Sequence, residues 1–366
     1  MRGSWRWLPI LLLCIMGALI EQNPATAQDM GAKSRTDAPA AVPPGNTAPR
    51  ISLDVQVTDN KGVPIRGLQQ QDFSVLDEKQ NQNIVSFAAV NSETASSAEP
   101  PVEIVLVVDA VNTSPATLGY VRDEVKKFLL SNDGQLAQPV SLVVFSRDGA
   151  ALPQASRDGK ALAASYDQQY KTDLKALNNQ DRGFQGDSER FNLSLQYFSS
   201  LLQYEQARPG RKLVVWVGPG WPTLGGIVDF PSRAHQDFFN SAVAFSTQLR
   251  EARMTLYSIQ PEGANEPDVQ VGFYTDYLKG VTAPSKTLPA NLGVQVLAIQ
   301  SGGRVFLKEN NVAKAIAECV QDARSFYVLA FDVPRAGRAN DYHKLAVTVD
   351  RPKTIARTRT GYYAQP

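Results

Sequence analysis

The chain of 366 residues carries 37 lysine and arginine residues against 36 aspartate and glutamate residues, a formal net charge of +1. This balance argues against nucleic acid or an anionic membrane surface as the main partner. A hydrophobic content of 43% allows a sizeable core, so the composition is that of an ordinary globular protein.

The first residues are typical of a secretory signal. Arg2 and Arg6 precede an apolar run at 8–20, and a small-residue Ala-Thr-Ala site follows. We therefore expect residues 1–27 to be a signal peptide and the protein to be exported, to the periplasm or outside the cell. The apolar run is short for a membrane span, so we expect no stable membrane insertion after cleavage. A retained anchor is the alternative. Cleavage would leave Cys319 without a disulfide partner in the chain.

A linker and a set of strands follow. Residues 28–48 are rich in alanine and proline, and they bury too little apolar surface to offset the entropy of ordering. We predict a disordered linker there. Apolar and polar residues alternate from Ile51, and the same alternation returns around Phe73 and Phe87, which is the period of half-buried strands. Residues 49–92 are thus predicted to be the first half of a small β domain.

The middle of the chain alternates continuous apolar runs with amphipathic stripes. The runs, typical of parallel strands covered on both faces, stand at 102–108, 142–145, 213–217, 254–259 and 304–307. The stripes, spaced as in helices, stand at 118–128, 191–202, 238–249 and 292–299. This alternation predicts that residues 101–323 form an α/β domain with a Rossmann-like, doubly wound and mostly parallel sheet.

Strand patterns return at the end of the chain, at 325–331, 345–349 and 355–363, where the last is expected to be one final strand. A two-stranded remnant is barely stable alone. We therefore expect residues 324–364 to join the N-terminal strands in one small β-sandwich, so that the α/β domain is inserted between its halves.

Several segments carry a family resemblance in the order in which they occur. They are Val57–Phe73, the strand Glu103–Asp109 followed by Asn112-Thr113, Pro209–Trp216, Gly302–Phe306, and His343–Pro352 closed by Gly361–Tyr363. Together they resemble the von Willebrand factor type A (VWFA) domain, and more specifically an exported bacterial family of VWFA-related proteins common in acidobacteria. The resemblance implies a vWA-like domain at residues 101–323 and an exported protein. It does not imply a particular partner.

The resemblance also implies where a metal would bind. Asp109 ends the first predicted parallel strand, where ligands bind in open α/β sheets. In metal-binding A domains this aspartate begins a motif with serines two and four residues later, which together hold Mg²⁺. Here those positions are Val111 and Thr113, so the resemblance implies a degenerate metal-ion-dependent adhesion site carried by Asp109 and Thr113, and no required cofactor.

The same loop has an explanation without metal, which we favour. Ser114 followed by Pro115 is typical of a helix N-cap with proline in the first turn. Asp109 and Asn112 would then accept hydrogen bonds from turn amides near the helix N-terminus.

An apolar loop at 218–230 is the second candidate feature. Aromatic residues in a loop near the strand ends are typical of interface anchors, so Trp221 and Leu224, together with Asn112, are candidate contacts with a protein partner. The alternative is that the loop folds over the edge of its own sheet.

We do not expect an enzyme. The two histidines, His235 and His343, fall at positions that favour surface roles, and Cys319 lies on an apolar helical stripe. The sequence contains no nucleophile elbow, zinc-protease helix or phosphate-binding loop.

The expected function is therefore protein–protein interaction in the bacterial envelope or outside the cell, through the strand C-terminal face of the vWA-like domain. The alternative is a structural component of an envelope assembly that acts through the β domain. A hydrolase with an unrecognised site is the third interpretation.

Overall fold

The computed structural model describes residues 49–91, 101–149, 154–176, 183–224, 230–263, 272–333 and 336–365. The predicted signal peptide and linker lie outside these residues. No helix within the described ranges is long and apolar enough to span a membrane.

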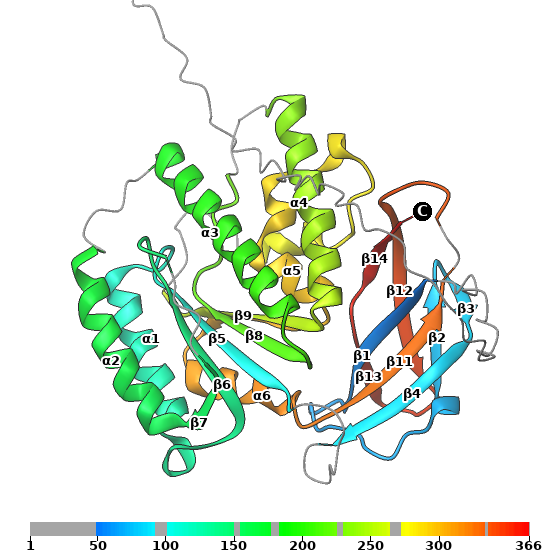
Figure 1. Cartoon of the computed structure of the whole chain (residues 1–366), viewed down its shortest axis with the longest axis horizontal. Helices are drawn as coiled ribbons and strands as arrows, with labels where there is room; N and C mark the ends of the chain where they lie inside the picture. Colours follow the sequence, from blue (N-terminus) through cyan, green and yellow to red (C-terminus); the bar gives the residue numbers. More distant parts are fainter. Residues whose placement is uncertain are drawn as a thin grey trace, which may run out of the picture. The chain divides into compact units, whose positions relative to one another are not determined.

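A six-stranded sheet with the order β10-β9-β8-β5-β6-β7 forms the α/β part of the chain (Figure 1). Its strands are β5 (Glu103–Asp109), β6 (Gln135–Phe145), β7 (Ser156–Asp158), β8 (Lys212–Val217), β9 (Met254–Pro261) and β10 (Val305–Glu309). Neighbouring strands from β10 to β6 run parallel, and only the edge strand β7 is antiparallel. The predicted α/β class with a mostly parallel sheet is confirmed.

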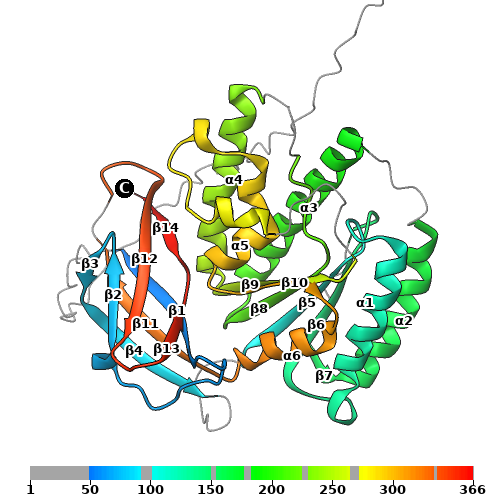
Figure 2. The same cartoon turned by 180° about the vertical axis from the view of Figure 1, so that it is seen from behind.

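Helices cover both faces of this sheet (Figures 1 and 2). They are α1 (Pro115–Leu129), α2 (Gly159–Ala176), α3 (Gly183–Gln206), α4 (Ser232–Glu251), α5 (Val294–Gln300) and α6 (Val312–Gln321). Successive residues of a strand point to opposite faces, so Leu106 of β5 joins a core with α1, α2 and α6. Val105 and Val107 join a second core with α3, α4 and α5. Every residue of β5 is buried, which explains its continuous apolar run.

Two antiparallel sheets combine strands from before and after the α/β part. Their orders are β13-β1-β11-β4 and β14-β12-β2-β3. The strands are β1 (Arg50–Asp59), β2 (Phe73–Asp77), β3 (Gln80–Gln82), β4 (Ile84–Asn91), β11 (Ser325–Asp332), β12 (Asp341–Val349), β13 (Thr354–Arg357) and β14 (Gly361–Ala364). Their inward residues, such as Leu53, Val75 and Leu329, form one shared hydrophobic cluster.

The single final strand predicted at 355–363 is wrong. The chain forms β13, which pairs with β1, and then β14, which pairs with β12 in the other sheet. Between them Thr358 donates its hydroxyl to the carbonyl of Asp54, and the Thr360 amide donates to the carbonyl of Gln300. These contacts hold the chain as it crosses from one sheet to the other.

Buried polar contacts connect the antiparallel sheets to the α/β part. Arg253 donates to the Asp54 carboxylate of β1 at 2.7 Å. The carboxylate of Asp322, just after α6, accepts from the Tyr257 hydroxyl at 2.8 Å and from Arg357 of β13 at 2.7 Å. Because these charged groups are largely buried, each depends on its partner for solvation.

A buried lysine joins the ends of two helices. The ammonium of Lys212, at the start of β8, donates to the carbonyls of Glu205, at 2.8 Å, and Arg208 after α3, and of Ala252 after α4, at 3.5 Å. Lys212 is only 1% exposed, and burial lowers the pKa of its ammonium. The Glu205 carbonyl also accepts from the Arg208 amide, so Lys212 matters most to the carbonyls of Arg208 and Ala252. A positive charge beside carbonyls at helix C-termini is stabilising.

Lys212→Met should lower the free energy of unfolding by about 2–4 kcal/mol, because it leaves buried carbonyls without a donor beside the buried Glu205. Urea denaturation checks this, with Lys127→Met as the matched control at a lysine whose side chain is 62% exposed. Equal stability of the two variants would contradict the role assigned to Lys212.

Candidate functional site

The site predicted from the sequence lies where the order of the parallel sheet reverses. When the strands β5 to β10 are counted along the chain, the sheet order is 6-5-4-1-2-3, and β5 and β8 are the two central neighbours. Ligands of open α/β sheets bind beyond the carboxyl ends of the strands at such a reversal. Val108 of β5 is in register with Val217 of β8, so Asp109 and Gly218 stand at this position.

The Asp109 carboxylate is fully buried and accepts hydrogen bonds on both oxygens. Oδ1 accepts from the amide of Asn112 at 3.0 Å and from its Nδ2 at 3.1 Å. Oδ2 accepts from the same Nδ2 at 2.9 Å and from Nε1 of Trp216 at 3.0 Å. Burial raises the pKa of Asp109 to about 6, and the hydrogen bonds from Asn112 and Trp216 oppose that rise.

Gly218 lets the chain after β8 pass directly over this carboxylate. A Cβ at this position would lie 2.7 Å from Cβ of Asp109 and 3.3 Å from Oγ1 of Thr113. Any larger residue would therefore push the loop away from β5, so the glycine is required by the close approach.

The structure thus brings the two predicted metal ligands, Asp109 and Thr113, beside the same glycine. Thr113 is 1% exposed, and its hydroxyl has no hydrogen-bond partner among the described residues. The same holds for Oδ1 of Asn112 and the hydroxyl of Tyr197, both also buried. Val111, where the adhesion motif has a serine, is buried in the core with α3.

These residues do not fit a resident Mg²⁺. Mg²⁺ requires near-octahedral oxygen ligands. The two oxygens of Asp109 instead face the N–H groups of Asn112 and Trp216, whose positive ends repel a cation. The described residues also contain no group of three or more histidine, cysteine, aspartate or glutamate side chains that could hold a metal ion.

The explanation without metal agrees with the geometry of the β5–α1 loop. Oγ of Ser114 accepts from the amide of Thr117 at the start of α1, and Pro115 occupies the first turn. The predicted N-cap is therefore confirmed, and Asp109 accepts from the Asn112 amide as expected. The expectation that Asn112 also accepts is wrong, because its Oδ1 has no hydrogen-bond partner among the described residues.

The loop after β8 folds over its own sheet, which is the alternative that the sequence left open. Trp221 is only 3% exposed and packs edge-to-face against Trp216 and Phe198, with ring centroids 5.3 Å from each. Trp221 is thus a core residue here, not an exposed anchor, because aromatic neighbours enclose it. Asn112 and Leu224 are half-buried. Residues 225–229 lie outside the described chain.

The histidines and the cysteine belong to other parts of the chain. His235 contacts the carbonyl of Thr287 through Nδ1 at 2.7 Å. His343 contacts the carboxylate of Asp77 at 3.0 Å, inside the antiparallel sheets. Cys319 is fully buried, and burial raises the pKa of its thiol. The hydrogen-bond partners of Asp109 among the described residues include none of the three.

Sequence reasoning missed two partners of the site, Trp216 and Ser194. Trp216 is in an apolar strand, where only its indole N–H signals the need for a buried acceptor. Ser194 of α3 accepts from Nδ2 of Asn112 at 3.0 Å. It lies 82 positions from Asn112, and no motif connects the two.

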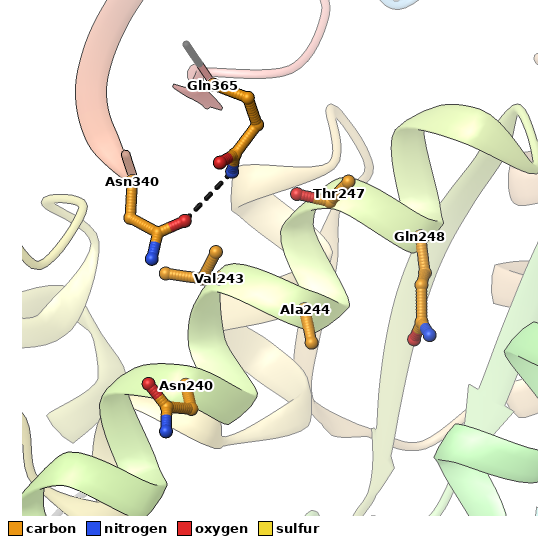
Figure 3. A pocket seen from close by; sticks show the side chains of 7 residues that line it. All are labelled: Asn240, Val243, Ala244, Thr247, Gln248, Asn340 and Gln365. Atoms are coloured by element: carbon orange, nitrogen blue, oxygen red, sulfur yellow. Dashed lines mark hydrogen bonds between the residues drawn. The ribbon is translucent and has the colours of Figure 1, made fainter. Parts of the chain in front are cut away.

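A surface hollow of about 400 Å³ lies beside α4 (Figure 3), and Asp109 and its hydrogen-bond partners are not among the residues that line it. It is lined by Asn240, Val243, Ala244, Thr247, Gln248, Asn340 and Gln365. Gln365 donates to Oδ1 of Asn340 at 2.8 Å across one end. Its polar lining groups are four side-chain amides and the hydroxyl of Thr247, and none of them is charged.

Neither a family model nor a curated protein matches the chain. Solved structures to which it is similar include the human COPII-coat protein Sec24c, at 10% identity and a TM-score of 0.35, with 76% of this chain and 46% of that chain covered. Proximal thread matrix protein 1 from the mussel byssus has 13% identity and a TM-score of 0.31, with 63% and 49% covered. The N-terminal domain of TFIIH p34 has 14% identity and a TM-score of 0.25, with 54% and 96% covered. The chain spans about half the length of the first two, and at these scores the likeness carries no argument about function.

Asp109 should make stability depend on pH. Its folded pKa of about 6 exceeds the ordinary 3.8, so its contribution is fully present below pH 4 and is lost as the pH rises through 6. Asp109→Asn does not titrate. Its free energy of unfolding relative to the parent should therefore rise by up to about 3 kcal/mol between pH 4 and pH 7. Urea denaturation across this range measures the difference, and a constant difference would contradict the assignment.

Millimolar Mg²⁺ or Mn²⁺ should leave the melting temperature unchanged, because protein donors already hold the Asp109 oxygens. A metal at 100 times its Kd would add about 2.7 kcal/mol to stability. A thermal melt with and without metal checks this, beside Asp109→Ala. A rise in the parent that is absent from the variant would instead establish a working metal site.

Proposed function

We propose that this chain is an exported vWA-like binding module, with a degenerate metal-ion-dependent adhesion site, that engages a protein partner in the bacterial envelope or outside the cell. The surface used is the face formed by the C-terminal ends of the parallel strands. Two features support the vWA-like assignment: the 6-5-4-1-2-3 strand order, and the aspartate at the end of the first parallel strand.

The observation that carries the proposal is the filled crevice at the sheet reversal. Asp109, Thr113 and Trp221 occupy it with exposures of 0%, 1% and 3%. A small molecule would have to displace these side chains and the hydrogen bonds of Asp109, at a cost of several kcal/mol. A protein partner needs only the outer surface of the surrounding loops.

Exposed residues are available on those loops for such a contact. Asp148 follows β6 and Glu262 follows β9, both at carboxyl ends of strands and both exposed. Asn112 and Leu224 border the same face and remain the proposed direct contacts. The buried tryptophans would hold these loops in place and would not touch the partner themselves.

The proposed function is not catalytic. A general base needs a free lone pair within reach of a substrate, and both oxygens of Asp109 already accept hydrogen bonds in a closed core. His343 and Asp77 form a close pair, but it lies within the antiparallel sheets and both groups bond to each other.

Capture of partners from an envelope extract tests the proposal. The bait is the full chain, compared with Asp148→Arg and Glu262→Arg on the strand-end face, and the bound proteins are identified by mass spectrometry. We expect one specific partner whose recovery falls roughly fivefold to thirtyfold in both variants, since a reversed charge at an interface costs on the order of 1–2 kcal/mol.

Gln135→Arg is the matched control. Gln135 is exposed at the amino end of β6, away from the carboxyl ends of the parallel strands, so recovery of the partner should not change. If the control and the face variants lose the partner equally, or if no partner is enriched, the strand-end proposal fails.

A structural role in an envelope assembly is the second candidate function. It is favoured by one observation, the long uncharged strand β4 at the edge of an antiparallel sheet.

A further inference from the structure

The edge strand β4 differs from the other edges of the two antiparallel sheets. It has eight residues, whereas β13 and β14 have four each and β3 has three. Among the described strands it pairs with β11 alone. From Ser86 to Val90, no described residue forms a hydrogen bond with its outer edge.

The residues of β4 lack most of the usual protection of an edge. Proteins protect exposed edges with short strands, charged residues, prolines or bulges. The segment Ile84–Asn91 contains neither a charged residue nor a proline. A single register shift, between Ser86 and Ile84, lies at its start, and the pairing with β11 is regular from Ser86 onward. From Ser86 to Val90 the strand therefore offers unpaired backbone donors and acceptors to another strand.

We propose that this edge binds β4 of a second copy of the chain, antiparallel, with Ala88 on the two-fold axis. Ser86 then lies opposite the partner's Val90, and Phe87 opposite the partner's Ala89. In each pair a larger side chain meets a smaller one, and no pair brings like charges together. A two-fold arrangement uses the same patch on both copies, so it closes as a dimer.

The faces of the strand agree with this register. Ser86, Ala88 and Val90 pair with residues of β11 on one face of the sheet, whereas Phe87 and Ala89 pair with Leu329 and Tyr327 of the sandwich core on the other. Residues opposite one another in an antiparallel ladder must share a face. Every antiparallel pairing of β4 with its own copy about one residue meets this requirement, so the choice of Ala88 rests on the sizes of the paired side chains.

This dimer is independent of the strand-end binding face, and it gives the second candidate function a defined contact. The two copies of the first antiparallel sheet would join in one continuous sheet across the two-fold axis. The edge would then be covered by backbone hydrogen bonds and not left open to arbitrary extended peptides.

Cysteine cross-linking of the full chain tests the register. Ala88→Cys places two thiols opposite one another, where Cα atoms of paired strands lie roughly 4.5–5.5 Å apart, a separation that a disulfide spans. Ser86→Cys is the matched control, because Ser86 and Ala88 are both exposed and share a face. Its two thiols would be roughly 13 Å apart, since four residues separate them along the ladder.

With oxidised glutathione we expect a disulfide-linked dimer from Ala88→Cys at several times the yield of Ser86→Cys and of the unsubstituted chain. Equal yields from the two variants would overturn the register, because they would indicate random collision.

Sedimentation of the full chain tests the dimer itself. Ala88→Lys opposes two like charges on the two-fold axis and should weaken the dimer about tenfold or more. Ala346→Lys, at an exposed position of the central strand β12, should leave it unchanged. A parent chain that stays monomeric up to roughly 100 µM would overturn the proposal, as would an Ala88→Lys variant that associates as strongly as the parent.

Discussion

The pairing of β1 with β11 on one side and β13 on the other brings the beginning and the end of the described chain together. Both antiparallel sheets depend on this pairing, because neither flank alone supplies a two-sided core. The entropic cost of closing a loop grows only slowly with its length, so a whole α/β body between the flanks is tolerated. The same pairing sets Asp54 beside Arg253 and Arg357 beside Asp322, which fixes the buried charges that link the sheets to that body.

At the centre of the α/β part, one hydrogen bond compensates for the burial of two polar groups. A buried carboxylate without donors and a buried indole N–H without an acceptor would each cost free energy. Asp109 and Trp216 satisfy one another, and Asn112 supplies the remaining donors. The glycine after β8 allows the loop to close over them. The position where this kind of sheet holds a ligand is therefore occupied by the protein itself, which is why the proposed recognition is assigned to the surrounding loops.

Much of the fold could be predicted from the sequence because periodicity reports burial directly. The fully buried β5 and the stripes of α1 and α4 have clear apolar patterns. Helix α2 was missed because its buried face includes Tyr166 and Tyr170 among polar residues, which weakens the apolar stripe. The division of the last strand was missed because only Thr358–Thr360 separate β13 from β14, and the strands differ in the partner with which each pairs. At the site, Asp109 was predicted, whereas its contact with Trp216, 107 positions away, depends on the register of β5 and β8.

The order of the strands along the chain also has a consequence in time. During synthesis β1 emerges early, while β11 and β13 emerge only after the entire α/β body. Until then β1 has neither of its strand partners, and such long-range pairings form slowly and leave the nascent chain prone to aggregation. A chain truncated before Ser325 therefore has a first strand with unpaired edges. Proteases and chaperones that bind unfolded segments can recognise such a strand.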